Sequence, residues 1–120
     1  MRLTRLAHVN LSVDDVAAAE AFYSGFLGLE RAPRPADAGR AGAWFRLGAS
    51  ELHLSLETGA DNARSKRHVA FELDDLDSAR AEAVTRGLSI EEGRPAPGIR
   101  RFFVRDPAGN RIELFERTSA

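Results

Sequence analysis

The stretch His8-Val-Asn-Leu-Ser-Val-Asp-Asp15 returns as His68-Val-Ala-Phe-Glu-Leu-Asp-Asp75, 60 residues later in a chain of 120 residues. Two further matches keep nearly the same offset: Leu27-Gly-Leu29 with Arg86-Gly-Leu88, and Leu52-His-Leu54 with Ile112-Glu-Leu114. Self-similarity over half of a chain indicates a structural repeat. We therefore expect a single domain over residues 1–120, made of a module 1–60 and a module 61–120.

Each module begins with a strand pattern and continues with a helix pattern. The repeated stretch alternates apolar and polar residues, which is typical of a strand with one buried face. The paired aspartates can cap a helix whose apolar residues recur at steps of three and four, and Gly28 or Gly87 ends it. The first helix should run from Val16 to Leu27. In the second helix we expect four residues to face inward: Leu76, Ala79, Ala83 and Val84.

Three short strand signals follow each helix. They cover residues 29–34, 43–47 and 51–57 in the first module and residues 88–92, 101–105 and 110–116 in the second. Hairpin turns are expected at Gly48-Ala-Ser50 and Asp106-Pro-Ala-Gly109, where turn-forming residues separate the last two strands. The element order is βαβββ twice, which predicts an α+β fold. The polar segment 58–66 joins the modules and is the expected hinge.

Composition narrows the range of functions. The chain has 43% apolar and 29% charged residues and no cysteine, which is typical of a globular domain without disulfides or thiolate chemistry. With 17 basic against 18 acidic residues it lacks the positive surplus that nucleic acid or an anionic membrane requires. Neither a signal-peptide pattern nor a membrane-spanning apolar run is present in the sequence. We expect a cytoplasmic protein with a small-molecule partner.

The three histidines of the chain lie at repeat-related positions. His8 corresponds to His68, and His53 corresponds to Glu113, so that 45 residues separate the members of each pair. All four lie on the polar face of their strands, opposite apolar neighbours. If the modules pack about a pseudo-twofold axis, the four side chains converge on one point.

Four such side chains would make a metal site. Three imidazoles and one carboxylate suit Zn²⁺, Ni²⁺, Fe²⁺, Co²⁺ or Mn²⁺ and suit Ca²⁺ or Cu⁺ poorly. A single histidine on a polar strand face is more often solvated than metal-bound, but coincidence at repeat positions favours ligation. The sequence therefore predicts a divalent-metal site at His8, His53, His68 and Glu113.

At these residues the chain resembles the vicinal oxygen chelate superfamily, which includes glyoxalase I, methylmalonyl-CoA epimerase, extradiol dioxygenases, fosfomycin-resistance transferases and bleomycin-resistance proteins. The resemblance covers nearly the whole sequence. Besides the repeated stretches, it rests on Ala21-Phe-Tyr23, Leu27-Gly-Leu29 and Phe103-Val-Arg-Asp-Pro-Ala-Gly-Asn-Arg-Ile-Glu-Leu114.

The resemblance implies a cup-shaped, eight-stranded mixed sheet with metal ligands at the four positions above. It also implies a homodimer in which each site takes His8 and His53 from one chain and His68 and Glu113 from its partner. Four protein ligands on an octahedral ion leave two adjacent positions for vicinal substrate oxygens. Glu113 matches the position that serves glyoxalase I as ligand and base, so lyase, isomerase or epimerase chemistry is the first expectation.

Other members of the superfamily supply the alternatives. Glyoxalase I enzymes carry glutamate, and the epimerases glutamine, where this chain has His53. His8, His68 and Glu113 alone make the two-histidine, one-carboxylate set of an Fe²⁺ extradiol dioxygenase, with His53 as an acid or base. Fosfomycin-type thiol transfer ranks lower, because loop 92–100 does not resemble the potassium-binding loop of those proteins. A metal-free, antibiotic-sequestering protein is the non-enzymatic alternative.

Some further residues have weaker signals. The guanidinium groups of the Pro/Gly-rich loop could bind a carboxylate or phosphate, and the strand aromatics could line a pocket, although strand aromatics are more often core. The loop arginines are Arg94, Arg100 and Arg101. The strand aromatics are Trp44, Phe45, Phe103 and Phe115.

Overall fold

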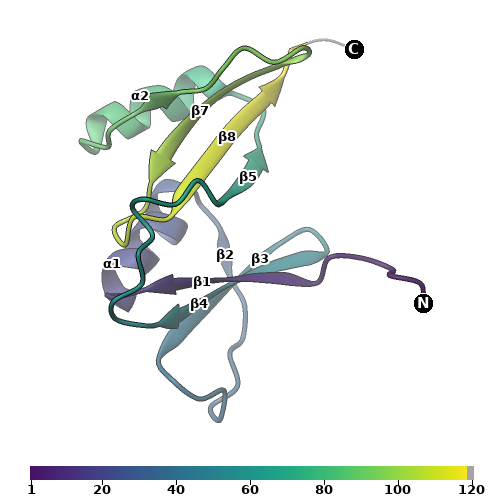
Figure 1. The fold of residues 1–120 in the computed structure, drawn as a ribbon, viewed down its shortest axis with the longest axis vertical. Helices are drawn as coiled ribbons and strands as arrows, with labels where there is room; N and C mark the ends of the chain where they lie inside the picture. The colour runs from purple at the N-terminus through teal and green to yellow at the C-terminus, as the bar shows by residue number, and fades with distance from the viewer. Residues whose placement is uncertain (119–120) are drawn as a thin grey trace. The chain divides into compact units, whose positions relative to one another are not determined.

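The computed structural model describes residues 1–118 (Figure 1). The chain divides into two compact units, unit 1 covering residues 1–60 and unit 2 beginning at Asp61. Each unit contains one four-stranded sheet with a helical segment between its first and second strands. The α+β class and the repeated βαβββ order are confirmed.

Unit 1 has the strand order β1-β4-β3-β2, in which β1 pairs parallel with β4 and the other neighbours are antiparallel. Its elements are β1 (His8–Val13), α1 (Val16–Glu20), η1 (Ala21–Phe26), β2 (Glu30–Arg31), β3 (Gly42–Leu47) and β4 (Ser50–Leu56). The second strand is shorter than the sequence pattern indicates, since only two residues pair with β3.

Unit 2 repeats this plan with the strand order β5-β8-β7-β6, again with one parallel pair, β5 with β8. Its elements are β5 (His68–Glu72), α2 (Leu76–Thr85), β6 (Glu91–Glu92), β7 (Ile99–Arg105) and β8 (Arg111–Arg117). Helix α2 lies along β7 and β8 (Figure 1). In both units the strand that carries the repeated histidine therefore pairs with the last strand.

Both helices begin at the second aspartate of the pair. The Asp15 side chain accepts a hydrogen bond from the Ala18 amide at 3.0 Å, and the Asp75 side chain accepts one from the Ser78 amide at 3.0 Å. These bonds satisfy amides that have no partner inside a helix. Of the two candidate caps in each module, the structure selects the later one.

The ends of the two helical segments differ. Gly87, at φ +73°, lies in a Schellman turn: its amide donates to Val84, and the next amide, of Leu88, donates to Ala83. The first segment was expected to be an α-helix through Leu27, but it is α-helical only to Glu20 and continues as the π-helix η1. The three- and four-residue spacing of apolar residues predicts a helix here without distinguishing its type.

One expectation for α2 is wrong. Leu76 and Ala83 are buried and Ala79 is half-buried, whereas Val84 is 64% exposed. Val84 follows Ala83 by one position, which turns its side chain about 100° around the helix axis and out of the buried face.

Each unit has its own apolar core between helix and sheet. In unit 1 the rings of Tyr23 and Phe45 are fully buried, with centroids 6.0 Å apart. The other core residues of unit 1 with at most 1% exposure are Val13, Ala19, Ala43 and Leu54. In unit 2 the core residues with at most 1% exposure are Leu76, Ala83, Phe102, Val104, Ile112 and Leu114.

The polar segment between the modules is only partly a linker. The Arg105 guanidinium donates to the carbonyls of Asn62, Ser65 and Gly109 at 3.2, 3.0 and 3.0 Å. The Asn62 residue is 8% exposed, and its side-chain amide donates to the Ala108 carbonyl at 3.2 Å. Residues 62–65 therefore pack on the β7–β8 hairpin of unit 2, which corrects the expectation of a hinge over residues 58–66.

No helix in the described part of the chain is long and apolar enough to cross a membrane.

Candidate functional site

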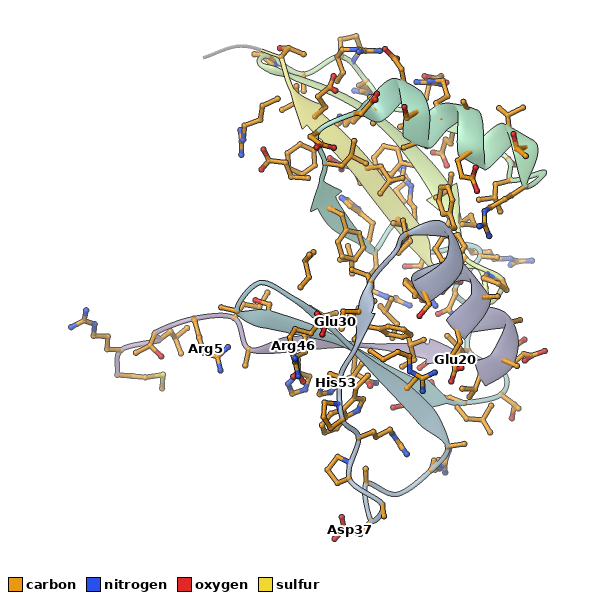
Figure 2. All side chains as sticks on the ribbon, turned by 180° about the vertical axis from the view of Figure 1, so that it is seen from behind. Arg5, Glu20, Glu30, Asp37, Arg46 and His53 are labelled. Atoms are coloured by element: carbon orange, nitrogen blue, oxygen red, sulfur yellow. The ribbon has the colours of Figure 1, made fainter. Side chains whose placement is uncertain are left out.

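The predicted ligands lie on the polar faces of the two sheets. His8 on β1 and His53 on β4 belong to unit 1, and His68 on β5 and Glu113 on β8 belong to unit 2. In Figure 2 the labelled His53 lies on the sheet of unit 1, where the register of β3 and β4 pairs it with Trp44. The neighbours of His53 along the strand, Leu52 and Leu54, are buried on the other face.

In unit 1, His53 is the middle ring of a three-ring stack. Its ring centroid lies 4.1 Å from that of His8 with an interplanar angle of 16°, and 3.9 Å from that of Trp44 with an angle of 2°. The His53 residue is 8% exposed. Its Nε2 donates to Glu51 Oε1 at 2.8 Å. His53 is therefore fixed on both faces and at one nitrogen.

This stack limits what His8 and His53 can ligate together. The lone pair of an imidazole nitrogen lies in the plane of the ring, so two nearly parallel rings direct their lone pairs side by side rather than at one point. At least one ring must turn before both can bind the same ion. His8 is exposed at the end of the stack, while His53 is held between two rings, so His8 is the one free to turn.

In unit 2, His68 and Glu113 form a close pair. His68 Nε2 lies 3.3 Å from Glu113 Oε1, and the Glu113 residue is 6% exposed. His68 Nδ1 lies 3.0 Å from the Lys66 carbonyl oxygen. Because a carbonyl only accepts, Nδ1 carries the hydrogen, and in the neutral ring Nε2 then has a lone pair.

When the His68 ring is neutral, its Nε2 and the Glu113 oxygen are two hydrogen-bond acceptors that lie close together. Two acceptors at this distance are stabilised by a cation that both bind or by a proton on one of them. Two donor atoms that each lie about 2.1 Å from one ion, at a right angle, are about 3 Å apart. The observed 3.3 Å is close to that separation, so His68 and Glu113 fit a divalent metal ion as they stand.

The bond from His68 to the Lys66 carbonyl also supports this arrangement. Metal-binding histidines usually donate their other ring N–H to a carbonyl or carboxylate, which fixes the tautomer and the ring orientation. The ring is further held by Phe103, whose centroid lies 5.4 Å away in an edge-on arrangement at 89°.

Two arginines also lie on this face of unit 2: Arg101, one of the expected anion-binding arginines, and Arg111, which the sequence patterns did not single out. Arg101 Nη1 is 3.7 Å from Glu113 Oε1, and Arg111 Cζ lies 3.6 Å above the Phe103 ring. Strand alternation could have placed both, because Arg111 is two residues from Glu113 and Arg101 two residues from Phe103. Arg100 and Arg101 lie on β7 and not in the loop where they were expected, because that strand already begins at Ile99. Arg100 pairs with Asp77 at 2.7 Å and Glu116 at 3.3 Å.

The structure thus brings His8 together with His53, and His68 together with Glu113, each pair within its own unit. Within either unit, residues 1–118 contain no group of three or more His, Asp or Glu side chains placed to hold a metal ion. Of the strand aromatics, Phe45 belongs to the core, whereas Trp44 and Phe103 contact the candidate ligands.

Comparison with known proteins defines the class. The family model described as the glyoxalase/bleomycin resistance protein/dioxygenase superfamily matches residues 5–114. The chain therefore belongs to this superfamily. No curated protein matches the sequence.

Solved structures share the fold over almost the whole chain. A glyoxalase family protein from Bacillus anthracis is 32% identical, with a TM-score of 0.87 over 98% of this chain and 100% of that one. A lactoylglutathione lyase from Agrobacterium tumefaciens is 26% identical, with a TM-score of 0.75 over 96% of this chain and 95% of that one. An antibiotic binding protein from a Streptomyces species, 20% identical, has a TM-score of 0.81 over 98% and 99%. This last likeness concerns the fold alone.

Proposed function

We propose that this chain is a divalent-metal-dependent enzyme that moves a proton next to chelated substrate oxygens, in a lyase, isomerase or epimerase reaction. The observation that carries the proposal is the close approach of His68 Nε2 and Glu113 Oε1, 3.3 Å apart, with the histidine tautomer set by the Lys66 carbonyl. The 26% identity to a lactoylglutathione lyase supports the same reaction class.

The residues that would hold the metal are His68 and Glu113, joined by His8 and His53. When bound, the metal would supply Lewis acidity and a template for two neighbouring substrate oxygens. Glu113 would accept the proton from the substrate carbon next to those oxygens, since its carboxylate is held at the site by His68 and Arg101. Burial to 6% exposure keeps water away from that carboxylate and strengthens its electrostatic interactions.

Metal titration tests this proposal. We expect the wild-type chain to take up about one equivalent of Zn²⁺, Ni²⁺, Co²⁺ or Mn²⁺, and His68→Ala to bind it more than about a hundredfold more weakly. Glu113→Gln should lose proton-transfer activity while it keeps its fold. Wild-type protein that takes up no metal would refute the proposal and would favour the antibiotic-sequestering alternative.

A second function is favoured by the position of His53. Its Nε2 is bonded to Glu51 and its ring is held between His8 and Trp44, an arrangement that suits an acid or base better than a ligand. The remaining donors, His8, His68 and Glu113, make the set that binds Fe²⁺ in oxygenases. This second proposal is an extradiol-type dioxygenase.

The His53→Ala variant separates the two proposals. If His53 is a ligand, its replacement should weaken metal binding about as much as His68→Ala does. If His53 is an acid or base, metal affinity should stay near the wild-type value while turnover falls. Uptake of iron rather than nickel, zinc, cobalt or manganese, together with dioxygen consumption on catechols, would decide for the dioxygenase.

We further infer a homodimer in which each site takes His8 and His53 from one chain and His68 and Glu113 from its partner. The arrangement of ligand pairs supports this, because each unit carries half of the predicted donor set on its own sheet.

A further inference from the structure

We propose that Arg101 binds an anionic group of the substrate, a carboxylate or a phosphate, beside Glu113. The inference rests on the proposed function, because it assumes that the substrate reacts at Glu113. It adds a substrate class, namely molecules that carry an oxyanion close to the reacting carbon.

Arg101 is placed next to the reacting group by the register of unit 2. It lies on β7 opposite Phe115, two residues from Phe103, which pairs with Glu113 across the strands. Its Nη1 is 3.7 Å from Glu113 Oε1, and its side chain is 25% exposed. The guanidinium is therefore within reach of a small molecule bound at that carboxylate.

Most of the hydrogen-bonding capacity of Arg101 is unused. A guanidinium carries five N–H donors in a planar fork. In the described part of the chain it makes one hydrogen bond, from Nη2 to the Arg94 carbonyl at 3.0 Å, and its Nε is buried without a partner. At 3.7 Å the pair with Glu113 is an ion pair rather than a good hydrogen bond.

The loop before β7 is shaped around this side chain. A Cβ atom on Gly93 would lie 2.7 Å from Arg101 Nε and 3.0 Å from Phe103 Cε2, so only glycine fits there without displacement. The hydrogen bond to the Arg94 carbonyl fixes the guanidinium against the next residue of the loop. Arg101 is thus held in a defined position rather than free in solvent, which lowers the entropy cost of binding an anion.

Arg111 adds positive charge to the same face. Its guanidinium lies over the Phe103 ring, with Cζ 3.6 Å from the centroid, and its Nη2 donates to Glu91 at 2.8 Å. Because the Arg111 guanidinium already donates to the Glu91 carboxylate, Arg101 is the better candidate to bind an anionic ligand. Planar guanidinium groups bind carboxylates and phosphates through paired hydrogen bonds.

The test is a titration of metal-free protein with inorganic phosphate and, separately, with acetate, at constant ionic strength, followed by amide and arginine Nε–H signals in NMR spectra. We expect saturable shifts at Gly93, Arg94 and Arg101 for at least one of the two anions. Arg101→Gln should weaken that binding about tenfold or more, since it removes a charged hydrogen-bond partner. The tighter of the two anions identifies the substrate group.

The matched control is Arg100→Gln, the same substitution one residue away, at a side chain bonded to Asp77 and Glu116 instead. It should leave anion binding unchanged. Arg101→Lys keeps the positive charge but loses the planar arrangement of N–H donors, so it should bind the anion with intermediate affinity. It serves as the test if Arg101→Gln does not fold. Equal binding in wild type, Arg101→Gln and Arg100→Gln, or no saturable binding in wild type, would overturn the proposal.

Metal uptake, measured on the same proteins, keeps this inference separate from the proposed function. Anion binding that depends on Arg101 in a protein that takes up no metal would refute the metal chemistry and support the anion site. Normal metal uptake without anion binding would refute the anion site alone.

Discussion

The rings of Trp44 and His53 lie face to face, 3.9 Å apart and 2° from parallel, on neighbouring strands of one sheet. Such close contact between a large aromatic ring and an imidazole holds the imidazole in one orientation. His53 is therefore less mobile than His8, which stacks on its other face but is itself exposed. Two histidines that look equivalent in the sequence have different freedom in the folded chain.

Trp44 is the only tryptophan of the chain, so its fluorescence reports on this stack directly. We predict that His53→Ala shifts the emission of Trp44 to longer wavelengths, because the indole loses the ring that shields it from water. It should also destabilise the protein by about 1 kcal/mol, the typical contribution of an aromatic pair. Emission spectra and denaturant unfolding measure both effects.

His8→Ala is the control for this prediction. It removes the outer ring of the stack, which does not contact Trp44, and should shift the emission much less. Equal shifts in the two variants would contradict the stacked arrangement.

Mixing two inactive variants tests whether sites are shared between chains. If each site takes His8 from one chain and His68 from the other, a mixed dimer of His8→Ala and His68→Ala contains one intact site. Random pairing of equal amounts should then restore about a quarter of the wild-type metal sites. Coexpression followed by metal analysis measures this fraction. Restoration of no sites would show that each chain builds its own.

Gly109 is predicted to be the more sensitive of two hairpin glycines. It has φ +87°, and a Cβ there would lie 3.1 Å from the Ala63 amide nitrogen, whereas Gly48, at φ +59°, has open space around it. Gly48→Ala should cost about 1–2 kcal/mol for the left-handed backbone alone. Gly109→Ala should cost more, because Ala63 must also move. Denaturant unfolding of both variants measures the difference. Equal costs for the two variants would contradict the packing of residues 62–65 on the hairpin.

Stability should fall in acid because of two aspartates at the start of α2. Hydrogen bonds from Ser78 lower the pKa of Asp75, and the hydrogen bond and charge of Arg100 lower the pKa of Asp77. A carboxyl group whose pKa is lowered on folding stabilises the protein above its unfolded pKa and loses that contribution as the pH falls through the folded value. The loss should therefore appear below about pH 4.

Unfolding midpoints at pH 5 and pH 3 measure this effect. Asp77→Asn should reduce the difference between the two midpoints, since it removes one of the groups responsible. Asp74→Asn is the control, because Asp74 takes no part in either contact. The same pH dependence in Asp77→Asn as in wild type would rule out the Arg100 pair as a source of acid sensitivity.

The repeat in the sequence predicted most of the fold. An offset of 60 residues placed the strands, the helix starts and the hairpins of unit 2 once those of unit 1 were recognised. Alternation along the strands predicted the faces on which His53 and Glu113 lie. These features depend on local periodicity, which is visible in a single sequence.

Other features depend on contacts that periodicity does not encode. The π-helical turn at Ala21–Phe26 has the same apolar spacing as an α-helix, and Val84 lies one position beyond the buried face of α2. The stack of His53 on Trp44 and the approach of Arg101 to Glu113 join residues on different strands, so they require the register of the sheet. The four candidate ligands could thus be identified from the sequence. The sequence could not show that His8 and His53 stack while His68 and Glu113 approach each other through their polar atoms.

The three carbonyls gathered by Arg105 determine where this chain can be divided. The carbonyls of Asn62, Ser65 and Gly109 all accept hydrogen bonds from the Arg105 guanidinium. Unit 2 therefore begins several residues before β5, its first strand. A gene fragment that starts at the strand itself would leave that guanidinium without two of its three acceptors. To express the second half alone, or to exchange it with the half of another protein, the cut belongs at Asp61.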